Sequence, residues 1–439
     1  MQHATSDHSR LVASQFQKTL EATESAPVEK LEQYRNGLLE KLVRHARETT
    51  PFYRARLDCL FRNDGTFDLS RWQEVPVLTR EVAEAHERDL RSQRIPPEHG
   101  TVSVIQTTGS TTRPLNVAIT ILSEIAAVAA FRRAMRWWKL DVVSRSMARI
   151  IVYSKEQQAA VGYPNGRRRQ GLTFSDIREL EMLTPVQQQI EWLSRNRTDY
   201  LVTSPINATA LAFAMSREQA RGLGFKAILA HSETVLPLAR EVVPDRFGAP
   251  MIAFYSCQEA GYIATQCPAG PYYHIVMENV LVEVLRDDGT PAPPGEPGQV
   301  VLTGFYNYAM PFIRYAVGDV ATLGAGPCSC GRTLPLIAQV DGRTRHAFRF
   351  EDGSYVWPRM LTFDIGRFVD CREFQLVQID PRNIELRYVP ASDRPPDQAG
   401  LNAYVRKLLH PSANTVAVAV QSVPKGPGGK LTPFVSLVE

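Results

Sequence analysis

The chain has 439 residues, of which 44% are hydrophobic and 22% are charged. These fractions are close to the average of soluble globular proteins, and they exclude a disordered, collagen-like or disulfide-stapled chain. The formal net charge of +4 is too small over this length to indicate a nucleic-acid binder.

The first residues and the sparse cysteines point to a reduced, cytoplasmic protein. The opening segment MQHATSDHSR is polar, so we expect no signal peptide. The longest apolar run, residues 115–131, is too short and too polar to cross a bilayer, so we expect no membrane partner. In a reducing compartment, grouped cysteines more often bind a metal ion than pair as disulfides.

Helices are expected in the first hundred residues. Apolar residues at helical spacing predict a helix that begins near residue 28 and ends before Thr50-Pro51, because a residue that precedes proline avoids the helical region. The next expected elements are short helices within 68–92, strands at 102–106 and 116–121, and a helix at 122–138.

Strands and helices then alternate, which is typical of an α/β sheet with parallel strands. The expected strands are 148–153, 200–203, 226–229 and 251–255, with helices at 206–216 and 234–242. This rhythm predicts a large N-terminal α/β domain over residues 1–341.

The pattern changes after about residue 270. Expected strands at 274–285, 298–304, 312–315 and 320–323 alternate around Pro- and Gly-rich turns, which predicts an antiparallel β subdomain at about 270–341. Residues 342–439 follow the order β-β-α-β and predict a small α+β C-terminal domain. Its expected elements are strands 373–379, 383–389 and 415–421 and a helix at 397–409.

A loop rich in hydroxyl side chains joins the strands expected at 102–106 and 116–121. Residues 107–114 read TTGSTTRP. Backbone N–H groups and hydroxyls of such a loop can wrap a polyphosphate, although an ordinary Ser/Thr-rich turn has the same composition. The chain has no Walker A spacing, no G-x-G-x-x-G that opens a helix after a strand, and no G-x-S-x-G elbow.

Three charged residues also lie where they could bind parts of a nucleotide or its metal ion. Glu259 follows a buried strand and could hold Mg²⁺, or it could be an ordinary loop glutamate. Asp319 follows a glycine and could bind the hydroxyls of a ribose, or it could simply belong to a turn. Lys430 lies in the glycine-rich segment PKGPGGKL, where it could reach a phosphate or stay solvated.

In this order the signals resemble the adenylate-forming (ANL) superfamily, in its phenylacetate–CoA ligase-like branch, over nearly the whole chain. The segments that carry the resemblance are the loop 107–114, AHSE at 230–233, YSCQE at 255–259, PFIRYAVGD at 311–319, the hinge start Gly342-Arg343, and Lys430. The resemblance implies a large AMP-binding domain followed by a small mobile C-terminal domain.

The resemblance also implies roles for individual residues. Lys430, Glu259 and Thr108 are the implied catalytic residues, and Glu259 is also the implied magnesium ligand. The implied nucleotide-binding residues are Thr107, Gly109, Ser110, Thr111, Thr112, Ser232, Glu233, Tyr255, Ser256, Asp319 and Arg343.

The implied reaction has two steps. A small, aromatic carboxylic acid attacks the α-phosphate of Mg-ATP, which gives acyl-AMP and pyrophosphate, and CoA then takes the acyl group as a thioester. Lys430, Mg²⁺ and the loop donors would offset the charge that develops on the phosphate. Relatives of this kind also suggest a homodimer.

Three departures from the family pattern keep alternatives open. The phosphate loop has Thr112 where the family has glycine, and Arg345 and His346 replace an acidic pair at the hinge. The next family glycine is displaced, with Glu351-Asp352-Gly353 in its place. The first half-reaction is therefore better supported than the second. One alternative is transfer of the acyl group to an amine, a carrier thiol or another small nucleophile. Another is a degenerate homologue that binds a nucleotide without turnover.

A possible metal site is separate from these motifs. Cys267, His274, Cys328 and Cys330 offer three sulfurs and one imidazole, a set that suits a closed, structural Zn²⁺ site. Buried free thiols are the alternative. A zinc ion here would hold the β subdomain together.

Overall fold

The computed structural model describes residues 7–107, 115–152, 167–169, 176–233, 235, 237–343, 347–356, 358, 365–424 and 434–438. The described residues form two compact units. The first unit contains residues 7–107, 115–317 and 321–340, and the second contains 318–320 and the described residues from 341 onward. The predicted boundary between two functional domains at 341 and 342 stays a prediction.

The N-terminal segment is helical. Helix α2 (Val28–Thr49) ends before Thr50, whose backbone is extended in front of Pro51, as predicted. Helix α1 (Asp7–Thr23) was not predicted from the sequence. The shorter helices are η1 (Pro51–Tyr53), η2 (Asp58–Leu60), η3 (Leu69–Glu74), α3 (Arg80–Ala85) and η4 (Pro97–His99).

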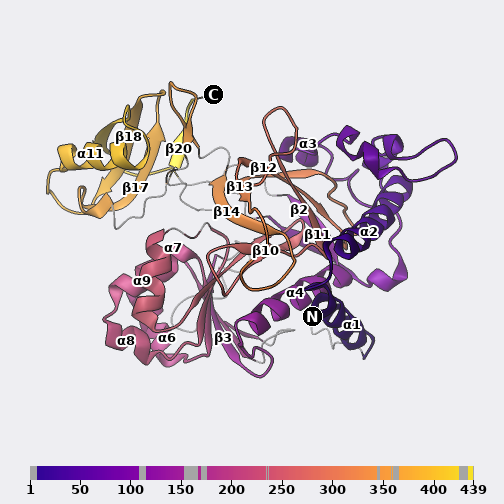
Figure 1. Ribbon diagram of the computed structural model, residues 1–439. Helices are drawn as coiled ribbons and strands as arrows, with labels where there is room; N and C mark the ends of the chain where they lie inside the picture. Colours follow the sequence, from indigo (N-terminus) through magenta and orange to yellow (C-terminus); the bar gives the residue numbers. More distant parts are fainter. Residues whose placement is uncertain are drawn as a thin grey trace. The chain divides into compact units, whose positions relative to one another are not determined.

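A parallel sheet forms the centre of the first unit, which confirms the α/β prediction. Its strands, in spatial order, are β5 (Asp176–Glu181), β3 (Ser146–Ile151), β6 (Tyr200–Thr203), β7 (Ala227–Ala230) and β8 (Met251–Cys257), with β4 (Arg167–Arg169) antiparallel at the edge. Figure 1 shows α6 (Val186–Arg195), α7 (Pro205–Ala214), α8 (Arg217–Gly222) and α9 (Pro237–Phe247) gathered together beside this sheet. Helix α4 (Ile121–Trp137) packs against the alternate side chains of the same strands.

Antiparallel strands continue the same sheet, which has twelve strands in the described part of the chain. Beyond β8 their order is β9 (Gly261–Gln266), β10 (Tyr273–Ile275), β14 (Leu336–Arg343), β13 (Tyr315–Leu323), β12 (Pro297–Gly304) and β11 (Val280–Leu285). Strands β1 (Val102–Gln106) and β2 (Asn116–Thr120) form a separate antiparallel ribbon.

Two expected strand boundaries in this region are wrong. The strand expected at 274–285 is broken by a turn, in which the N–H of Asn279 donates to the carbonyl of Val276. The strands expected at 312–315 and 320–323 are one strand, β13. It begins only at Tyr315 because Arg314 has a φ of 49°, which is incompatible with an extended strand.

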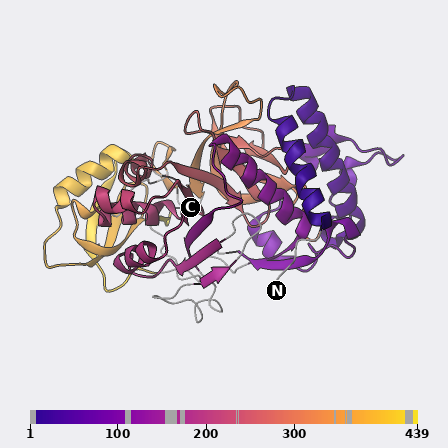
Figure 2. The same cartoon turned by 90° about the horizontal axis from the view of Figure 1, so that it is seen from below.

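Helices α1 and α4 lie side by side in both Figure 1 and Figure 2. A buried ion pair supports this contact: Arg133 on α4 lies 2.6 Å from the carboxylate of Glu278, and both side chains are almost fully inaccessible. Thr23, the last residue of α1, donates its hydroxyl to the same carboxylate. The pair therefore joins α1, α4 and the turn before β11.

The second unit has its own hydrophobic core. Strands β19 (Asn414–Ala419), β18 (Asn383–Pro390), β17 (Cys371–Gln378) and β20 (Phe434–Ser436) form its main sheet in that order, and α11 (Gln398–Leu408) packs on β19. Strands β15 (Phe348–Arg349) and β16 (Tyr355–Val356) form a small ribbon. The predicted β-β-α-β order is confirmed, with β20 as an additional strand.

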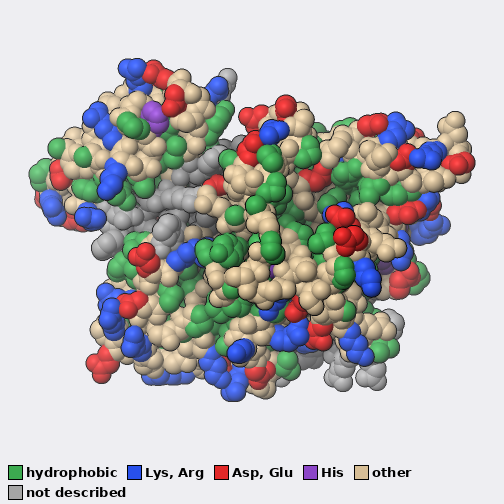
Figure 3. Space-filling view, viewed as in Figure 1, with side chains coloured by type: hydrophobic (Ala, Val, Ile, Leu, Met, Phe, Trp, Pro, Cys, Tyr) green, Lys and Arg blue, Asp and Glu red, His purple; other side chains and the backbone are tan. Residues whose placement is uncertain are grey.

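On the face that Figure 3 shows, Lys and Arg side chains are interspersed with Asp and Glu, and the described residues form no basic stripe there. Within the ranges given above, no helix combines the length and the apolar character needed to cross a membrane.

Candidate functional site

Glu259 lies in the turn between β8 and β9, where the parallel half of the sheet meets the antiparallel half. Strand β8 pairs in parallel with β7 and antiparallel with β9. Ligand crevices of α/β sheets lie beyond the carboxyl ends of the strands, so this turn is well placed for chemistry. The side chain of Glu259 is only 7% exposed, and a buried carboxylate must have partners.

Two side chains provide these partners. The hydroxyl of Tyr315 donates to Oε1 of Glu259 over 3.0 Å, and Nη1 of Arg80 lies 3.3 Å from the same oxygen. Among the described residues, none bonds the other carboxylate oxygen, Oε2, of Glu259. A carboxylate oxygen is a ligand that Mg²⁺ prefers. The residues present therefore fit the predicted magnesium ion.

Arg80 also links Glu259 to the start of the hydroxyl-rich loop. Its Nη2 donates to Oγ1 of Thr107 over 2.9 Å, and the N–H of Leu115 donates to the same oxygen over 2.9 Å. The bond between Thr107 and Leu115 therefore holds the two ends of the loop together, and Arg80 bonds the Thr107 side chain that makes it. Sequence reasoning missed Arg80, because nothing in α3 resembles a site motif.

Arg314, within the segment PFIRYAVGD, is a buried structural anchor. Its guanidinium donates to the carbonyl of Val75 over 2.7 Å and forms an ion pair of 3.1 Å with Glu283. Its backbone N–H donates to Oγ1 of Thr303 over 2.9 Å. These bonds stabilise the positive φ of Arg314, which sets the position of Tyr315 beside Glu259.

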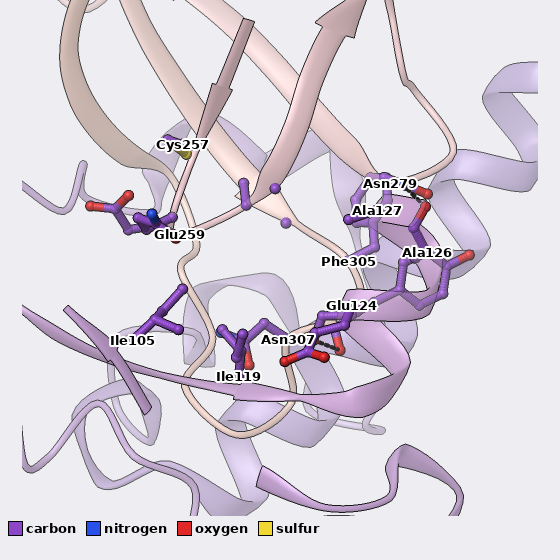
Figure 4. Close-up of a pocket in the computed structure, with 16 residues that line it drawn as sticks. Ile105, Ile119, Glu124, Ala126, Ala127, Cys257, Glu259, Asn279, Phe305 and Asn307 are labelled. Carbon is purple, nitrogen blue, oxygen red and sulfur yellow. Dashed lines mark hydrogen bonds between the residues drawn. The ribbon is translucent and has the colours of Figure 1, made fainter. Parts of the chain in front are cut away.

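A cavity of about 170 Å³ borders Glu259. Figure 4 shows residues from the β1–β2 ribbon, from α4 and from the β8–β9 turn converging on it. Small residues form part of its wall, namely Ala126, Ala127, Ala260, Gly261 and Gly304. The rest of the wall is formed by Ile105, Ile119, Cys257, Phe305 and Tyr306 and by the polar residues Ser123, Glu124, Gln258, Glu259, Asn279 and Asn307. It is large enough for one aromatic ring.

His231 and its neighbours follow β7. The ring of His231 stacks on Phe254 at 4.9 Å, and burial, together with the charge of Arg149, lowers the pKa of His231 to about 4. Ser232 has a φ of 72°, and both Ser232 and Glu233 are exposed at the carboxyl end of the strand. This places them where a nucleotide could contact them.

The structure describes some of the other predicted nucleotide-binding residues fully, one by its backbone alone, and others not at all. Tyr255 is buried at the end of β8 with Ser256 half-buried beside it, and Asp319 is half-buried within β13. Arg343 ends β14, and only its backbone is described. Thr108, Gly109, Ser110, Thr111, Thr112 and Lys430 lie outside the described residues. The structure does not test the roles of these residues.

The four predicted metal ligands come together in the first unit. The ligand atoms of Cys267, His274, Cys328 and Cys330 all lie within 4.8 Å of one another. The sulfurs of Cys267 and Cys328 are 3.7 Å apart, close to the roughly 3.8 Å that two thiolates keep on a tetrahedral zinc ion. The cluster joins the end of β9 and strand β10 to the loop between β13 and β14.

Neighbouring groups and burial set the orientation and the protonation of these four ligands. Nδ1 of His274 lies 3.3 Å from the carbonyl of Leu334, which fixes the ring and leaves Nε2 on the side of Cys330, at 3.2 Å from its sulfur. Burial lowers the pKa of His274 to about 4, so the ring is neutral, as a ligand must be. Burial raises the pKa of Cys267 to about 12, so this thiol needs a cation beside it to ionise at neutral pH.

Comparisons with known proteins agree with this architecture. The phenylacetate–coenzyme A ligase of Thermus thermophilus is 24% identical over 334 residues, which cover 73% of this chain and 72% of the relative. The ligase of the same name from Escherichia coli is 23% identical over 386 residues, 83% of this chain and 82% of the relative. The chain is phenylacetate–coenzyme A ligase-like. No protein-family model matches it.

The solved structures show the fold of this phenylacetate–CoA ligase-like chain. A crystal structure of 2-hydroxyisobutyryl-CoA ligase in the postadenylation state aligns with a TM-score of 0.71 at 17% identity, covering 95% of this chain and 91% of that one. The fold is therefore that of the adenylate-forming superfamily, as predicted.

Proposed function

We propose that this chain catalyses the ATP-dependent adenylation of a small carboxylic acid and then transfers the acyl group to coenzyme A. The observation that supports it best is the bonded series Thr107–Arg80–Glu259–Tyr315. This series fixes the buried carboxylate of Glu259 beside the two joined ends of the hydroxyl-rich loop 107–114. The names of the two bacterial relatives support coenzyme A as the acceptor.

Each part of the site has a distinct task in this proposal. Glu259 holds Mg²⁺, which neutralises phosphate charge, while the hydroxyls and N–H groups of residues 107–112 bind the phosphates. Lys430 stabilises the charge that develops on the α-phosphate. The remaining nucleotide contacts are Ser232, Glu233, Tyr255, Ser256, Asp319 and Arg343.

We propose that the organic part of the acid enters the cavity beside Glu259, and that the acid is aromatic. The apolar part of the wall and the volume suit a single ring. An Ala127→Leu substitution would fill the cavity, and we expect it to raise the KM for the acid while the KM for ATP stays unchanged. Val128→Leu, on the same helix but away from the cavity wall, is the matched control.

We further propose that Cys267, His274, Cys328 and Cys330 hold a structural Zn²⁺ ion. All four protein positions of a tetrahedral site are filled, so the metal has no open position for a substrate. A homodimer and a cytoplasmic location stay predictions.

The test is pyrophosphate release from Mg-ATP across aryl and short-chain acids, with and without coenzyme A. Release that depends on one acid, with a thioester formed when coenzyme A is added, is the expected result. Release that coenzyme A does not change would favour an amine or a carrier thiol as acceptor. ATP binding without release for any acid would contradict the ligase proposal and favour a nucleotide-binding homologue.

A further inference from the structure

The loop between β13 and β14 carries two of the four metal ligands and, directly after them, two residues that bind the corner between α1 and α2. The corner consists of residues 24–27. The N–H of Thr333 donates to the carbonyl of Glu24 over 3.0 Å, and its hydroxyl donates to the carbonyl of Ala26 over 2.7 Å. Thr333 is only three residues beyond Cys330.

Arg332, between the ligand Cys330 and Thr333, reaches the same corner. Its Nε lies 3.8 Å from the carboxylate of Glu24. Its guanidinium also lies 4.2 Å from the ring centre of Trp137, and the rings of Trp137 and His274 pack edge-on with their centres 5.4 Å apart. Arg332 therefore connects the α1–α2 corner to Trp137 in the last turn of α4, and Trp137 in turn contacts the metal ligand His274.

Apart from Leu334, which is buried in the main core, the loop itself has few contacts of its own that hold its shape. Residues 324–335 contain neither helix nor strand. Gly331 has a φ of 81°, a conformation that L side chains rarely adopt, and its N–H closes a turn on the carbonyl of Cys328 over 3.0 Å. The buried apolar side chains around the ligands are few. A loop of this length without regular structure needs an external constraint, which a metal ion supplies through bonds to the cysteines.

We infer that a metal ion bound by the four ligands fixes residues 328–333, and that this loop anchors the α1–α2 corner, so that metal occupancy controls how firmly α1 is held. The inference rests on the zinc site proposed above. Other contacts hold α1 independently, among them Thr23 with Glu278 and Phe16 against Tyr306 at 4.9 Å. Loss of the metal should therefore loosen the corner locally and leave the fold intact.

This anchoring extends to the substrate cavity. Helix α1 packs on α4, whose first half lines the cavity, and Phe16 of α1 touches the cavity residue Tyr306. A loosened α1 removes support from one wall. Metal loss should thus weaken acid binding even though the ligands lie outside the cavity.

The test is hydrogen exchange of the full-length protein before and after zinc removal, with metal content measured in parallel. We expect about one zinc ion per chain, as a closed tetrahedral site predicts. After chelation, amides in peptides that cover residues 20–30 should exchange roughly tenfold faster, which corresponds to the loss of one or two hydrogen bonds. Peptides from β17 and β18 in the second unit are the control, and added zinc should restore the original rates.

Two variants separate the metal from the anchor. Cys330→Ser should lose zinc and loosen the corner. The double variant Arg332→Gln/Thr333→Val should keep zinc and loosen the corner equally, while Arg286→Gln, at an exposed pair, should change neither. If Cys330→Ser fails to fold, chelation of the wild type provides the same comparison.

The outcomes distinguish this inference from the proposals on which it rests. Bound zinc whose removal leaves exchange at residues 20–30 unchanged would overturn the inference, and the zinc site would stand. Protein isolated without metal, and with no uptake of added zinc, would overturn both. Pyrophosphate release reports on the ligase proposal independently of either result.

Discussion

The hydroxyl of Tyr315 lies 3.0 Å from Oε1 of Glu259, although β13, which Tyr315 begins, and β8, which Glu259 follows, are separated by three other strands in the sheet. Burial and the charge of Glu259 both raise the pKa of Tyr315, so its proton stays on the phenol. The phenol therefore always donates, which orients the carboxylate.

Tyr315→Phe should slow pyrophosphate release about tenfold, because one charge-assisted hydrogen bond that orients Glu259 is lost. The apparent affinity for Mg²⁺ should fall as well. The measurement is release against Mg²⁺ concentration. Tyr53→Phe is the control, since the buried hydroxyl of Tyr53 bonds the backbone of Pro311 and Ile313 instead. Equal Mg²⁺ dependence in both variants would show that Tyr315 only stabilises the fold.

Lys430→Ala should reduce adenylation by roughly 10²–10³-fold, because a positive charge that stabilises the transition state is removed. Lys425→Ala, five residues earlier in the same segment, should have little effect. Thioester formation from supplied acyl-AMP and coenzyme A tests the second step. Loss of both steps in Lys430→Ala alone would contradict a role confined to adenylation.

Glu278→Gln should lower the free energy of unfolding by about 3–5 kcal/mol, because it leaves Arg133 as a buried charge without its counterion. Urea unfolding of the first unit measures this. The double variant Glu278→Gln/Arg133→Met should recover part of the lost stability, since it leaves no unpaired charge buried at this site. Glu296→Gln, in an exposed pair with Arg286, should leave the unfolding midpoint unchanged.

Stability should fall as the pH drops from about 6.5 towards 4, in part because of His231. Its pKa is about 4 in the folded chain against an ordinary value of 6.5, so the unfolded chain binds more protons in this range. The stabilisation is complete above pH 6.5 and is lost as protons bind. His231→Phe should flatten the decline in thermal midpoint, whereas His86→Phe, at an exposed position, should not. Parallel curves for His231→Phe and the wild type would contradict this prediction.

Strands β1 and β6 begin and end at the residues expected from the sequence. Strand β6 is buried along its whole length, and an unbroken run of apolar and β-branched residues marks it. Strand β1 is largely exposed, and it was predicted from its β-branched residues and from the hydroxyl-rich loop that follows it. Helix α1 was missed because its polar sequence indicates no core. Among its described side chains, Leu20 is fully buried where α1 packs on α4, a contact that only the fold creates.

The site was predictable only where its residues belong to a local motif. Glu259 follows a strand, and Cys328 and Cys330 lie close together in the sequence, so local rules could find them. Arg80 was not predicted, because its two partners Thr107 and Glu259 are 27 and 179 residues away. Sequence spacing does not report a contact that arises when separate elements pack.

The turn at Glu259 constrains the length of the chain as well as its chemistry. Strand β8, which leads into this turn, is registered with β7 on one edge and with β9 on the other, so one extra residue within β8 would shift the side chains that follow it, including Glu259, out of phase. The exposed turn Asp287–Gly289, at the far end of the sheet, has no such double registration. Insertions, tags and sites for cleavage belong at that distal turn, whereas redesign beside Glu259 is confined to exchanging one side chain for another.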